Sequence, residues 1–375
     1  MYITREEIIM NNRTTPLYEV NEDDSKILLL AYPLVDSYPA TSCAMAILQT
    51  YLTDSKWFYN SFIQLYEVQN KALDFFDFSM ENNPFLVYSE LDFAIINKIS
   101  NLKDFIITSI NEGYYVRLFI NTKYISLYNC DVDFYHDIMV YGYDRTHFFV
   151  ADHFSKGKFS FEKVEIDIIL RAYDILKLTH EDIESNKHIC LIQLLKPEIS
   201  MYRLQMDFIK NSKNEKESLF SVDFLRIKKS IEDYIMCRPT YGWYSRIRGI
   251  NNTIYHAHMW GINCYEVLKK HVYSLENDKF EYFATQSFYI ECLHKKMMKK
   301  RIEMITAEGL LNNGYLHEKH IADLYNETRK LLNLYLKEKM TQKDKRQTNK
   351  LISLINTIVL KEQVVFENIL DDFLI

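Results

Sequence analysis

The sequence predicts an α+β protein with two parts: a mixed part of helices and strands over residues 1–197, and an all-helical part over residues 198–375. Residues 136–152 read HDIMVYGYDRTHFFVAD, two β-rich runs around a polar turn, which is the pattern of an antiparallel hairpin. From about residue 200 onward, apolar residues recur at the spacing of helices. The length of 375 residues also exceeds what a single compact core normally holds.

Local patterns predict the individual elements of both parts. In the first part we expect helices over 43–53, 55–68 and 100–111, and strands over 114–120, 136–143, 147–152 and 188–195. In the second part, helical spacing marks the segments MYRLQMDFIKN, DFLRIKKSIEDYI, NCYEVLKKHVYSL and TQSFYIECLHKKMMKKRIEMI. Two long helices follow after the turn LNNGYL.

The composition argues against several classes of protein. A net charge of −6 and an isoelectric point near 6.0 give no overall attraction to nucleic acid or to an anionic membrane. The six cysteines form no C-x-x-C pair and the eight glycines form no phosphate-binding loop, so we expect neither a zinc ribbon nor a nucleotide cofactor. The N-terminus has no signal-like pattern, and the chain has no apolar run of the roughly eighteen residues that a membrane span needs. We therefore expect a cytoplasmic protein with reduced cysteines.

Cys43 is the first candidate for chemistry, within the stretch SYPATSCAMAILQTYL. Small and polar residues from Pro39 to Ser42 precede a run that is apolar on nearly every face, which predicts the N-terminus of a buried helix. In the first turn of such a helix, free backbone N–H groups and the helix dipole stabilise a thiolate, so Cys43 is a candidate nucleophile. A buried cysteine is more often a small apolar side chain, and this alternative stays open.

A thiol nucleophile needs a base, and the base needs an acceptor that orients it. His136 opens one strand of the predicted hairpin, and Asp152 lies near the end of the returning strand. An odd-numbered turn centred near Asp144 or Arg145 places His136 and Asp152 on the same face of the sheet, nearly opposite each other. A two-residue turn places His153 there instead, and the sequence does not decide between these registers.

The chain order of cysteine, histidine and aspartate resembles that of papain-like cysteine enzymes. The hairpin HDIMVYGYDRTHFFVAD is similar to that of the C39-type branch. The segments GYYVRLFINTKYISL, YGWYSRIRGI and KFEYFATQSFYIECLHKKMM resemble the butirosin-biosynthesis-protein-H-like family of acyltransferases. This resemblance spans most of the chain and implies a papain-like cysteine-protease fold with an added all-helical C-terminal domain that covers the site.

Carried over to this chain, the resemblance implies Cys43 as nucleophile, His136 as general base and acid, and Asp152 as the orienting carboxylate. Papain-like peptidases place an oxyanion-hole glutamine six residues before the nucleophile, where this chain has Ser37. The backbone N–H of Cys43, together with Ser37 or Tyr38, is therefore the candidate oxyanion donor set. An amide substrate depends more on that hole than a thioester does, so this departure weakens a peptidase assignment.

The function implied by the family is amide-bond formation in secondary metabolite biosynthesis of the non-ribosomal-peptide type. The acyl group would come from a phosphopantetheine thioester on an acyl or peptidyl carrier protein, pass through a cysteine acyl-enzyme, and reach a small amine, such as a diamine. The pantetheine arm would enter as part of the substrate, with no cofactor of the enzyme's own. Two alternatives stay open: a cytoplasmic cysteine peptidase with the same triad, and a catalytically inactive papain-like scaffold that binds a carrier protein or a peptide.

Substrate-binding candidates lie in the second part. The aromatic segment YGWYSRIRGINNTIYHAHMW contains Trp243, Arg246 and Trp260, which would suit the wall of an acyl or pantetheine channel, although aromatic segments are more often core. Glu266 or Glu291 is the candidate partner for the positive charge of the amine.

Two other patterns are weaker. The basic runs 295–301 and 337–350 are typical of solvated helix faces, and either would also suit docking of an acidic carrier protein. His256, His258 and Cys264 have no acidic or cysteine partner at the usual spacing of a metal site, so we expect no metal there.

Overall fold

The computed structural model describes residues 24–51, 56–68, 72–76, 85–92, 101–154, 157–179, 188–194, 222–240, 259–277, 283–342 and 347–375. The chain divides into two compact units. The first comprises Met1–Asp54 and Asn83–Asn211, and the second comprises Ser55–Asn82 and Ser212–Ile375. The predicted boundary at 197/198 lies outside the described residues. The sequence did not indicate that the segment 55–82 belongs with the C-terminal helices.

The first unit is built on an antiparallel sheet, as predicted. Its strands are β1 (Lys26–Ile27), β4 (Leu86–Asp92), β5 (Tyr115–Asn121), β6 (Tyr135–Tyr143), β7 (His147–His153), β8 (Phe159–Glu165) and β9 (His188–Leu194). They follow the order β4-β9-β5-β6-β7-β8, and β1 pairs with β6. The hairpin β6–β7 therefore lies inside the sheet, where its inward side chains are buried.

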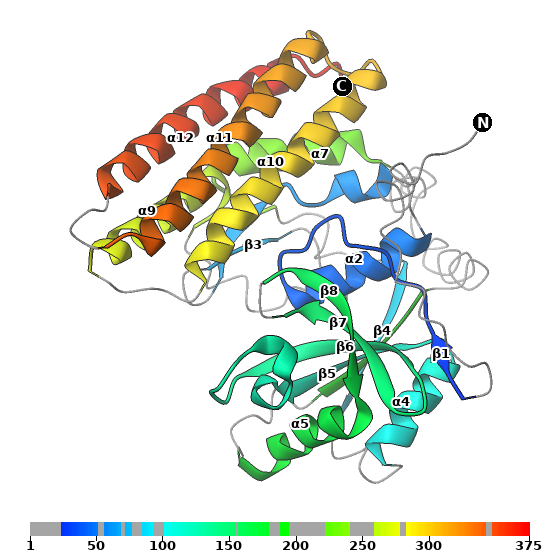
Figure 1. Cartoon of the computed structure of the whole chain (residues 1–375). Coiled ribbons are helices and arrows are strands. Elements are labelled where there is room, and N and C mark those ends of the chain that lie inside the picture. The colour runs from blue at the N-terminus through cyan, green and yellow to red at the C-terminus, as the bar shows by residue number, and fades with distance from the viewer. Residues whose placement is uncertain are drawn as a thin grey trace, which may run out of the picture. The chain divides into compact units, whose positions relative to one another are not determined.

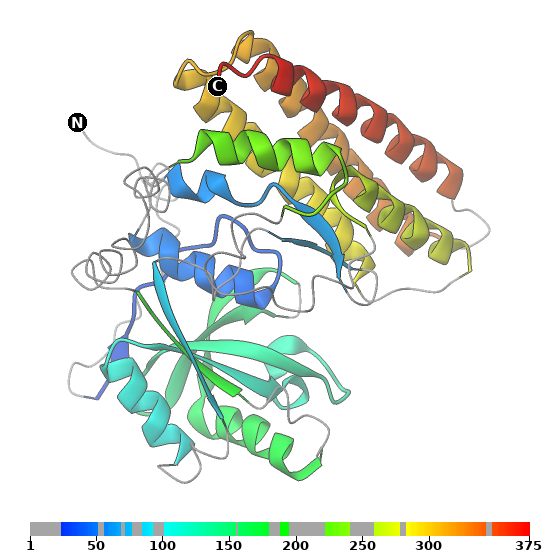
Figure 2. The same ribbon diagram turned by 180° about the vertical axis from the view of Figure 1, so that it is seen from behind.

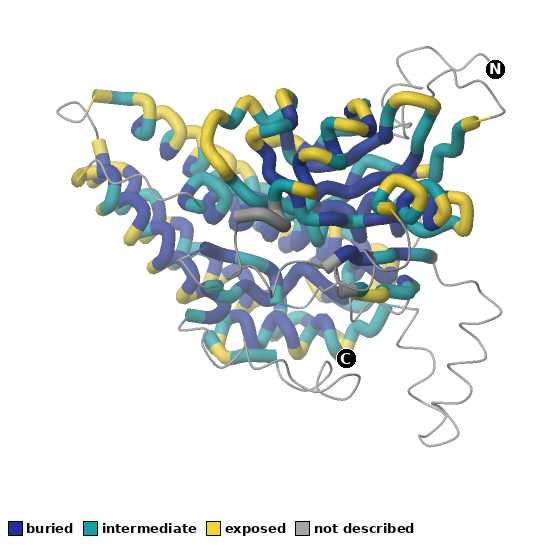
Figure 3. The backbone as a smooth tube through the Cα atoms, turned by 90° about the horizontal axis from the view of Figure 1, so that it is seen from below, coloured by how far each residue is buried: buried dark blue, intermediate teal, exposed yellow. Residues whose placement is uncertain are grey.

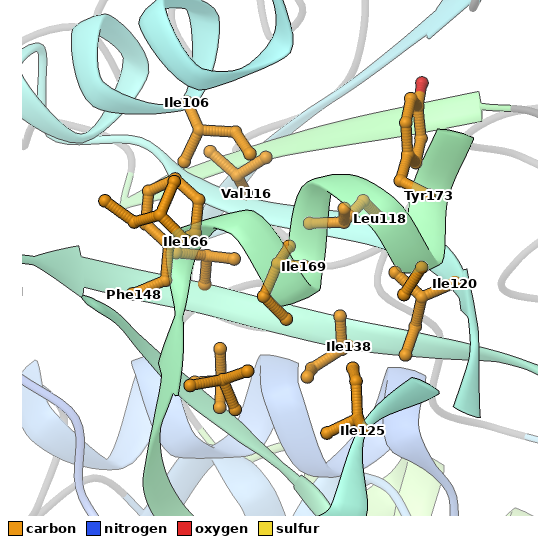
Figure 4. Close-up of a cluster of buried hydrophobic side chains, with 14 of the residues drawn as sticks. Ile106, Val116, Leu118, Ile120, Ile125, Ile138, Phe148, Ile166, Ile169 and Tyr173 are labelled. Carbon is orange, nitrogen blue, oxygen red and sulfur yellow. The ribbon is translucent and has the colours of Figure 1, made fainter. Parts of the chain in front are cut away.

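Three helices cover this sheet: α2 (Pro39–Tyr51), α4 (Leu102–Asn111) and α5 (Ile166–Thr179). Figures 1 and 2 show α4 and α5 on one side of the sheet and α2 on the other. On the side of α4 and α5, Ile106, Val116, Ile138, Phe148 and Ile169 pack into one buried cluster (Figure 4). Successive side chains of a strand point to opposite faces of the sheet, which places Val116 of β5 and Ile138 of β6 on the same face of this sheet.

Most expected elements of the first unit are present. The helix predicted over 100–111 is α4, with Asn101 as its N-cap, and the predicted strands match β5, β6, β7 and β9 within two residues. The strands β4 and β8 and the helix α5 were not predicted. In β8 the burial pattern is mostly intermediate, so its sequence carries little of the alternation by which a strand is identified.

The second unit combines the C-terminal helices with a short hairpin. Its elements are η1 (Lys56–Asn60), β2 (Leu65–Val68), β3 (Ala72–Phe75), α7 (Phe224–Ile235), η8 (Gly261–Cys264), α9 (Tyr265–Glu276), α10 (Ala284–Ala307), α11 (Gly314–Met340) and α12 (Thr348–Asp371). The all-helical C-terminal region is thus confirmed for the described residues. Buried and exposed positions alternate along the long helices (Figure 3), which is the pattern of amphipathic helices packed side by side.

The helix predicted over 55–68 is wrong. The structure has the 3₁₀ helix η1 followed by the strand β2, and Phe62 between them has a φ of 65°. A left-handed backbone at a bulky residue ends any helix at that point. The aromatic side chains Trp57, Phe58 and Phe62 are buried here and pack as core residues of the second unit, so tertiary packing decides the local conformation.

A buried ionic network joins the helices of the second unit. Lys295 Nζ lies 2.6 Å from Glu362 Oε1 and 3.0 Å from Glu291 Oε2, and all three side chains are at most 1% exposed. Tyr234 and Tyr265 donate hydrogen bonds to the two oxygens of Glu362, at 2.9 and 2.7 Å. Burial raises the pKa of Glu291 to about 7, with the charge of Lys295 opposing this rise. The interpretation of Lys295 as part of a solvated basic face is therefore wrong.

Replacing Lys295 should destabilise the second unit strongly. Lys295→Met leaves Glu291 and Glu362 buried without a cation, and breaking a buried pair in this way costs about 3–5 kcal/mol. Urea unfolding of the full chain measures the loss. Since the buried Glu291 can protonate instead, the deficit should be smaller near about pH 5 than near about pH 8. The control is Lys299→Met, whose partly exposed pair with Glu303 spans 3.7 Å and should contribute about 0.5 kcal/mol or less. Equal losses in the two variants would contradict the prediction.

Candidate functional site

The helix α2 carries Cys43, but not in its first turn. The helix begins at Pro39, a residue type favoured at the first helical position, and the Ser42 N–H already donates to Tyr38 O at 2.8 Å. The N–H of Cys43 therefore lies within the helical hydrogen-bond ladder. The expectation that it is a free oxyanion donor in the first turn is wrong, because the helix starts four residues earlier than the cysteine.

The environment of the Cys43 thiol favours the neutral form. The residue is 1% exposed, and the helix residues around it, from Ser42 to Leu48, are all buried. Burial raises the pKa of the thiol well above its usual value, the charge of Asp152 raises it further, and Arg117 opposes both. The sequence-based expectation of a stabilised thiolate is therefore not met in this state, because desolvation exceeds any effect of the helix dipole.

The turn of the hairpin has two residues. The Asp144 N–H donates to His147 O at 2.9 Å, which closes the turn between them. A regular ladder from such a turn would place His153, and not Asp152, on the face of His136. The sequence left these two registers open.

A β-bulge in β6 changes this register, so that Asp152 instead of His153 lies on the face of His136. The pairing shifts by one residue just after Val140, and beyond the bulge Met139 pairs with Ala151. An extra residue on one strand reverses the alternation of faces relative to its partner. If the pairing of Met139 with Ala151 is extended toward the start of β6, His136 and Asp152 become diagonal neighbours on one face of the sheet.

His136 and Asp152 form a hydrogen-bonded pair. His136 Nε2 lies 3.1 Å from Asp152 Oδ2, and the carboxylate is fully buried while the imidazole is 24% exposed. The hydroxyl of Tyr128, at the end of η4 (Ser126–Tyr128), donates a second hydrogen bond to the same oxygen. Since a carboxylate oxygen accepts, the Nε2 atom of His136 carries a proton, and Nδ1 is the ring nitrogen left to accept one.

His153 contacts the other side of the same carboxylate. Its Nδ1 lies 3.7 Å from Asp152 Oδ1, and its Nε2 lies 2.9 Å from Asp36 O and 3.4 Å from Ser42 Oγ. A carbonyl oxygen only accepts, so Nε2 of His153 donates to Asp36 O. His153 thereby ties β7 to the turn before α2 and to the residue next to Cys43.

Charge interactions between His136 and Asp152 shift the pKa values of both groups. Burial lowers the pKa of His136, but hydrogen bonding and charge attraction to Asp152 outweigh it, so the net pKa is raised. Burial raises the pKa of Asp152, but its hydrogen bonds, the one from His136 first, bring it to about 2. The raised pKa of His136 stabilises the fold below its usual value near 6.5, and this contribution is lost as the pH rises through the folded value. The lowered pKa of Asp152 contributes above about pH 4 and is lost as the pH falls toward 2.

The thiol lies near this pair without being bonded to it. The helix α2 packs against β6 and β7, and the charge of Asp152 acts on Cys43. Among the described residues, no hydrogen bond joins the Cys43 thiol to His136 or to His153. The structure thus brings together two members of the expected triad, with the third in the helix that packs on their hairpin.

Alkylation tests the state of this thiol. Cys43 should react slowly with iodoacetamide near about pH 7, and its rate should rise about tenfold per pH unit, because only the thiolate is nucleophilic and its pKa is raised. Peptide mass spectrometry of the native chain gives the rate for each cysteine. Cys130, which is partly exposed, serves as the internal control and should be labelled first. Labelling of Cys43 ahead of Cys130 at about pH 6 would contradict a neutral thiol and indicate a thiolate–imidazolium pair.

The remaining site candidates have different outcomes. Ser37 is buried and Tyr38 is partly exposed, both directly before α2, and nothing in their geometry selects either as an oxyanion donor. Trp243 and Arg246 lie outside the described residues. Trp260 lies in the second unit, where it is 7% exposed and its ring stacks on that of Tyr66.

The two carboxylates expected to bind an amine both have lysine partners. Glu291 pairs with Lys295, and Glu266 pairs with Lys269 at 2.6 Å. Glu291 is also buried in the helical core. These pairings argue against either glutamate as the amine-binding carboxylate, since an incoming ammonium group would have to displace a lysine.

Sequence reasoning missed three residues around the pair. Tyr128 reaches Asp152 from a short 3₁₀ turn, and no local pattern indicated this contact. Arg117 and Asp137 pair across β5 and β6, with Arg117 Nε 3.7 Å from Asp137 Oδ1, and both act on the Cys43 thiol by charge. No local pattern marks this pair; the register of β5 against β6, with Met139 opposite Arg117 and Phe119 opposite Asp137, places the two on one face.

Comparisons with known proteins give no assignment. No protein-family model matches this chain, and no curated protein sequence matches it. Within the described residues, no group of three histidine, cysteine or acidic side chains is arranged to hold a metal ion. In the same part of the chain, no helix is both long and apolar enough to span a membrane.

Proposed function

We propose that this chain is a cysteine-dependent acyltransferase of the papain-like class, with Cys43 as nucleophile, His136 as general base and acid, and Asp152 as the orienting carboxylate. The observation that carries the proposal is the His136–Asp152 pair at 3.1 Å, on a hairpin against which the helix of Cys43 packs. Nucleophilic catalysis by a thiol requires a histidine oriented by a carboxylate, and here the charge of Asp152 acts on the Cys43 thiol.

The reaction proceeds in two transfers. In the first, Nδ1 of His136 takes the Cys43 proton as the sulfur attacks the thioester carbonyl, and the same proton goes to the departing pantetheine thiol. In the second, an amine attacks the acyl-cysteine, His136 accepts the amine proton, and the Cys43 thiol leaves with it. Asp152 holds the tautomer with Nε2–H and stabilises the imidazolium in both transfers.

A thioester donor would acylate Cys43 without activation by a nucleotide. Exchange of one thioester for another is close to isoenergetic, so acylation of Cys43 needs no nucleotide. Formation of the amide then proceeds at the expense of a donor activated elsewhere. The chain has no phosphate-binding glycine loop, which agrees with a donor that is activated by another enzyme.

The resemblance of the sequence to the butirosin-biosynthesis-protein-H-like family supports the same reaction. Within that family, the tyrosine-rich chain looks most like the papain-like transacylase of closthioamide assembly. On that likeness, the acyl group would be an aryl-capped β-alanine chain on a carrier protein, passed to a diamine. This assignment of substrates rests on the likeness alone.

The burial of Cys43 favours an inactive papain-like scaffold as a second candidate. A thiol that is 1% exposed, with a raised pKa and no hydrogen bond to His136, is also what a purely structural cysteine presents. A cysteine peptidase would use the same three residues and differ in the fate of the acyl group.

Intact-protein mass spectrometry after incubation with an acyl-loaded carrier protein tests the proposal. The acyltransferase gains the mass of the acyl group, whereas the scaffold gains none, and a peptidase that accepts the thioester passes the acyl group to water. Following the decay of the acyl-enzyme with and without a diamine then separates transfer from hydrolysis. Equal decay in both conditions would make the protein a hydrolase, because transfer wins over water only if the amine is bound.

A further inference from the structure

The hairpin β2–β3 of the second unit has one apolar and one mixed face. The register pairs Tyr66 with Asp74 directly across the two strands, so their side chains share a face. On the opposite face, Leu73 and Phe75 are buried, and β3 packs against α10, which Figure 1 shows beside it. The face of Tyr66 and Asp74 is only partly buried.

Three aromatic rings gather on the mixed face. Trp260 forms a β-bridge to Tyr66, and the two rings stack with centroids 5.5 Å apart. Phe76 points its edge at Trp260, at 4.9 Å, and at Tyr66, at 5.6 Å. Ring faces and carboxylates both attract cations, so this set of side chains has the composition of an ammonium-binding site.

Asp74 has no cation of its own among the described residues. Its Oδ1 accepts the Phe75 N–H at 2.8 Å, and no described lysine, arginine or histidine lies within ion-pair distance. Burial raises the pKa of Asp74 to about 7, and the one backbone hydrogen bond opposes this rise only in part. A carboxylate left without a cation destabilises the folded chain, and such a cost is typical of groups kept for binding.

We propose that Asp74, with the rings of Tyr66, Phe76 and Trp260, binds the ammonium group of a primary amine. This inference rests on the proposed function for its biological role, since the amine would be the acyl acceptor. The ammonium group pairs with the Asp74 carboxylate, and the rings contact it and the adjoining methylene groups. Asp74 takes the role that the sequence suggested for Glu266 or Glu291, both of which already hold a lysine.

Calorimetric titration of the full chain with 1,4-diaminobutane tests the site directly. We expect saturable binding of the diamine and none of 1,4-butanediol, which has the same length without the charge. Asp74→Asn should weaken diamine binding by about tenfold or more, because the variant keeps the shape and loses the charge. The control Glu266→Gln should bind as the wild type does.

Two further readouts distinguish a binding role from a structural one. Diamine affinity of the wild type should rise as the pH passes through about 7, since Asp74 ionises there while the amine stays charged. Among the residues that the structure describes, the titratable groups near Asp74 include Tyr66 on the facing strand and, at the hairpin's opposite face, Glu67 with Lys270 of α9 and His294 of α10. Without ligand, Asp74→Asn should melt at the same or a higher temperature than the wild type, because a desolvated carboxylate has been removed.

The possible outcomes distinguish failure of the amine site from failure of the proposed acyltransferase reaction. Diamine binding that is equal in wild type and Asp74→Asn, or absent up to about 10 mM in the wild type, overturns the site whatever the enzyme does. In the acylated enzyme, Asp74→Asn should raise the diamine concentration for half-maximal transfer without changing acyl-enzyme formation. If no acyl-enzyme forms in the wild type, the proposed function fails, and the calorimetric result still decides the amine site.

Discussion

Cys43→Ala should abolish acyl-enzyme formation. Without the thiol there is no sulfur to carry the acyl group, and loss of a nucleophile typically costs about a million-fold in turnover. The fold should persist, because a buried thiol replaced by hydrogen removes only a small volume from α2. Intact mass after incubation with the acyl-loaded carrier measures the acyl-enzyme, and thermal unfolding measures the fold.

The matched control for this variant is Cys190→Ala. Cys190 is a buried cysteine of the same unit, 3% exposed, whose thiol is hydrogen-bonded to Tyr88. Its removal should leave acylation unchanged. Residual turnover of Cys43→Ala above about a hundredth of the wild type would exclude Cys43 as nucleophile, because loss of a nucleophile typically lowers turnover by far more than about a hundredfold.

The sequence was informative where local pattern and tertiary packing agree. The apolar run after Cys43 and the two β-rich runs of the hairpin each match what the structure buries. The segment 55–68 failed because its apolar spacing suits either a helix or a strand. Packing against the C-terminal helices, which lie far along the chain, selects the strand.

In the candidate site, too, the structure differs from what the local sequence predicts. The two-residue turn after Asp144 predicts that His153 faces His136, and only the bulge beyond Val140 reverses this. Gly142, an isolated glycine inside the strand at the bulge, is a local signal that could have indicated it. The protonation state of Cys43 was missed because the helix was expected to begin at about residue 43. It begins at Pro39, so the buried thiol lies beyond the first turn, where the helix dipole would favour a thiolate.

Asp152 occupies the central position in this site, with a histidine at each oxygen. His136 lies at Oδ2 and His153 lies near Oδ1, while Tyr128 donates to Oδ2 as well. The two histidines differ in how they contact the carboxylate: Nε2 of His136 lies 3.1 Å from Asp152, whereas Nδ1 of His153 lies 3.7 Å away and its Nε2 donates to Asp36 O. On this difference we propose that His136 transfers the proton and that His153 has a positioning role.

Asp152→Asn should lower turnover by about ten-thousandfold while binding of the carrier changes little. The asparagine amide can donate to Nε2 of His136, which selects the tautomer with Nδ1–H and leaves no lone pair for the thiol proton. Without the carboxylate, burial lowers the pKa of His136 and only the charge of Asp137 still opposes it, so the pKa should fall from its raised value. The acidic limb of the kcat/KM profile should accordingly move to lower pH.

The comparison with His153→Ala decides whether this assignment is right. That variant frees the turn before α2 and should reduce acylation through misplacement of Cys43, with the acidic limb of the profile unchanged. If His153→Ala is the more damaging change and also shifts the limb, His153 is the catalytic base. The register of the hairpin would then serve to present His153 to the thiol, and the buried His136–Asp152 pair would be structural, since only the histidine that exchanges the thiol proton sets that limb.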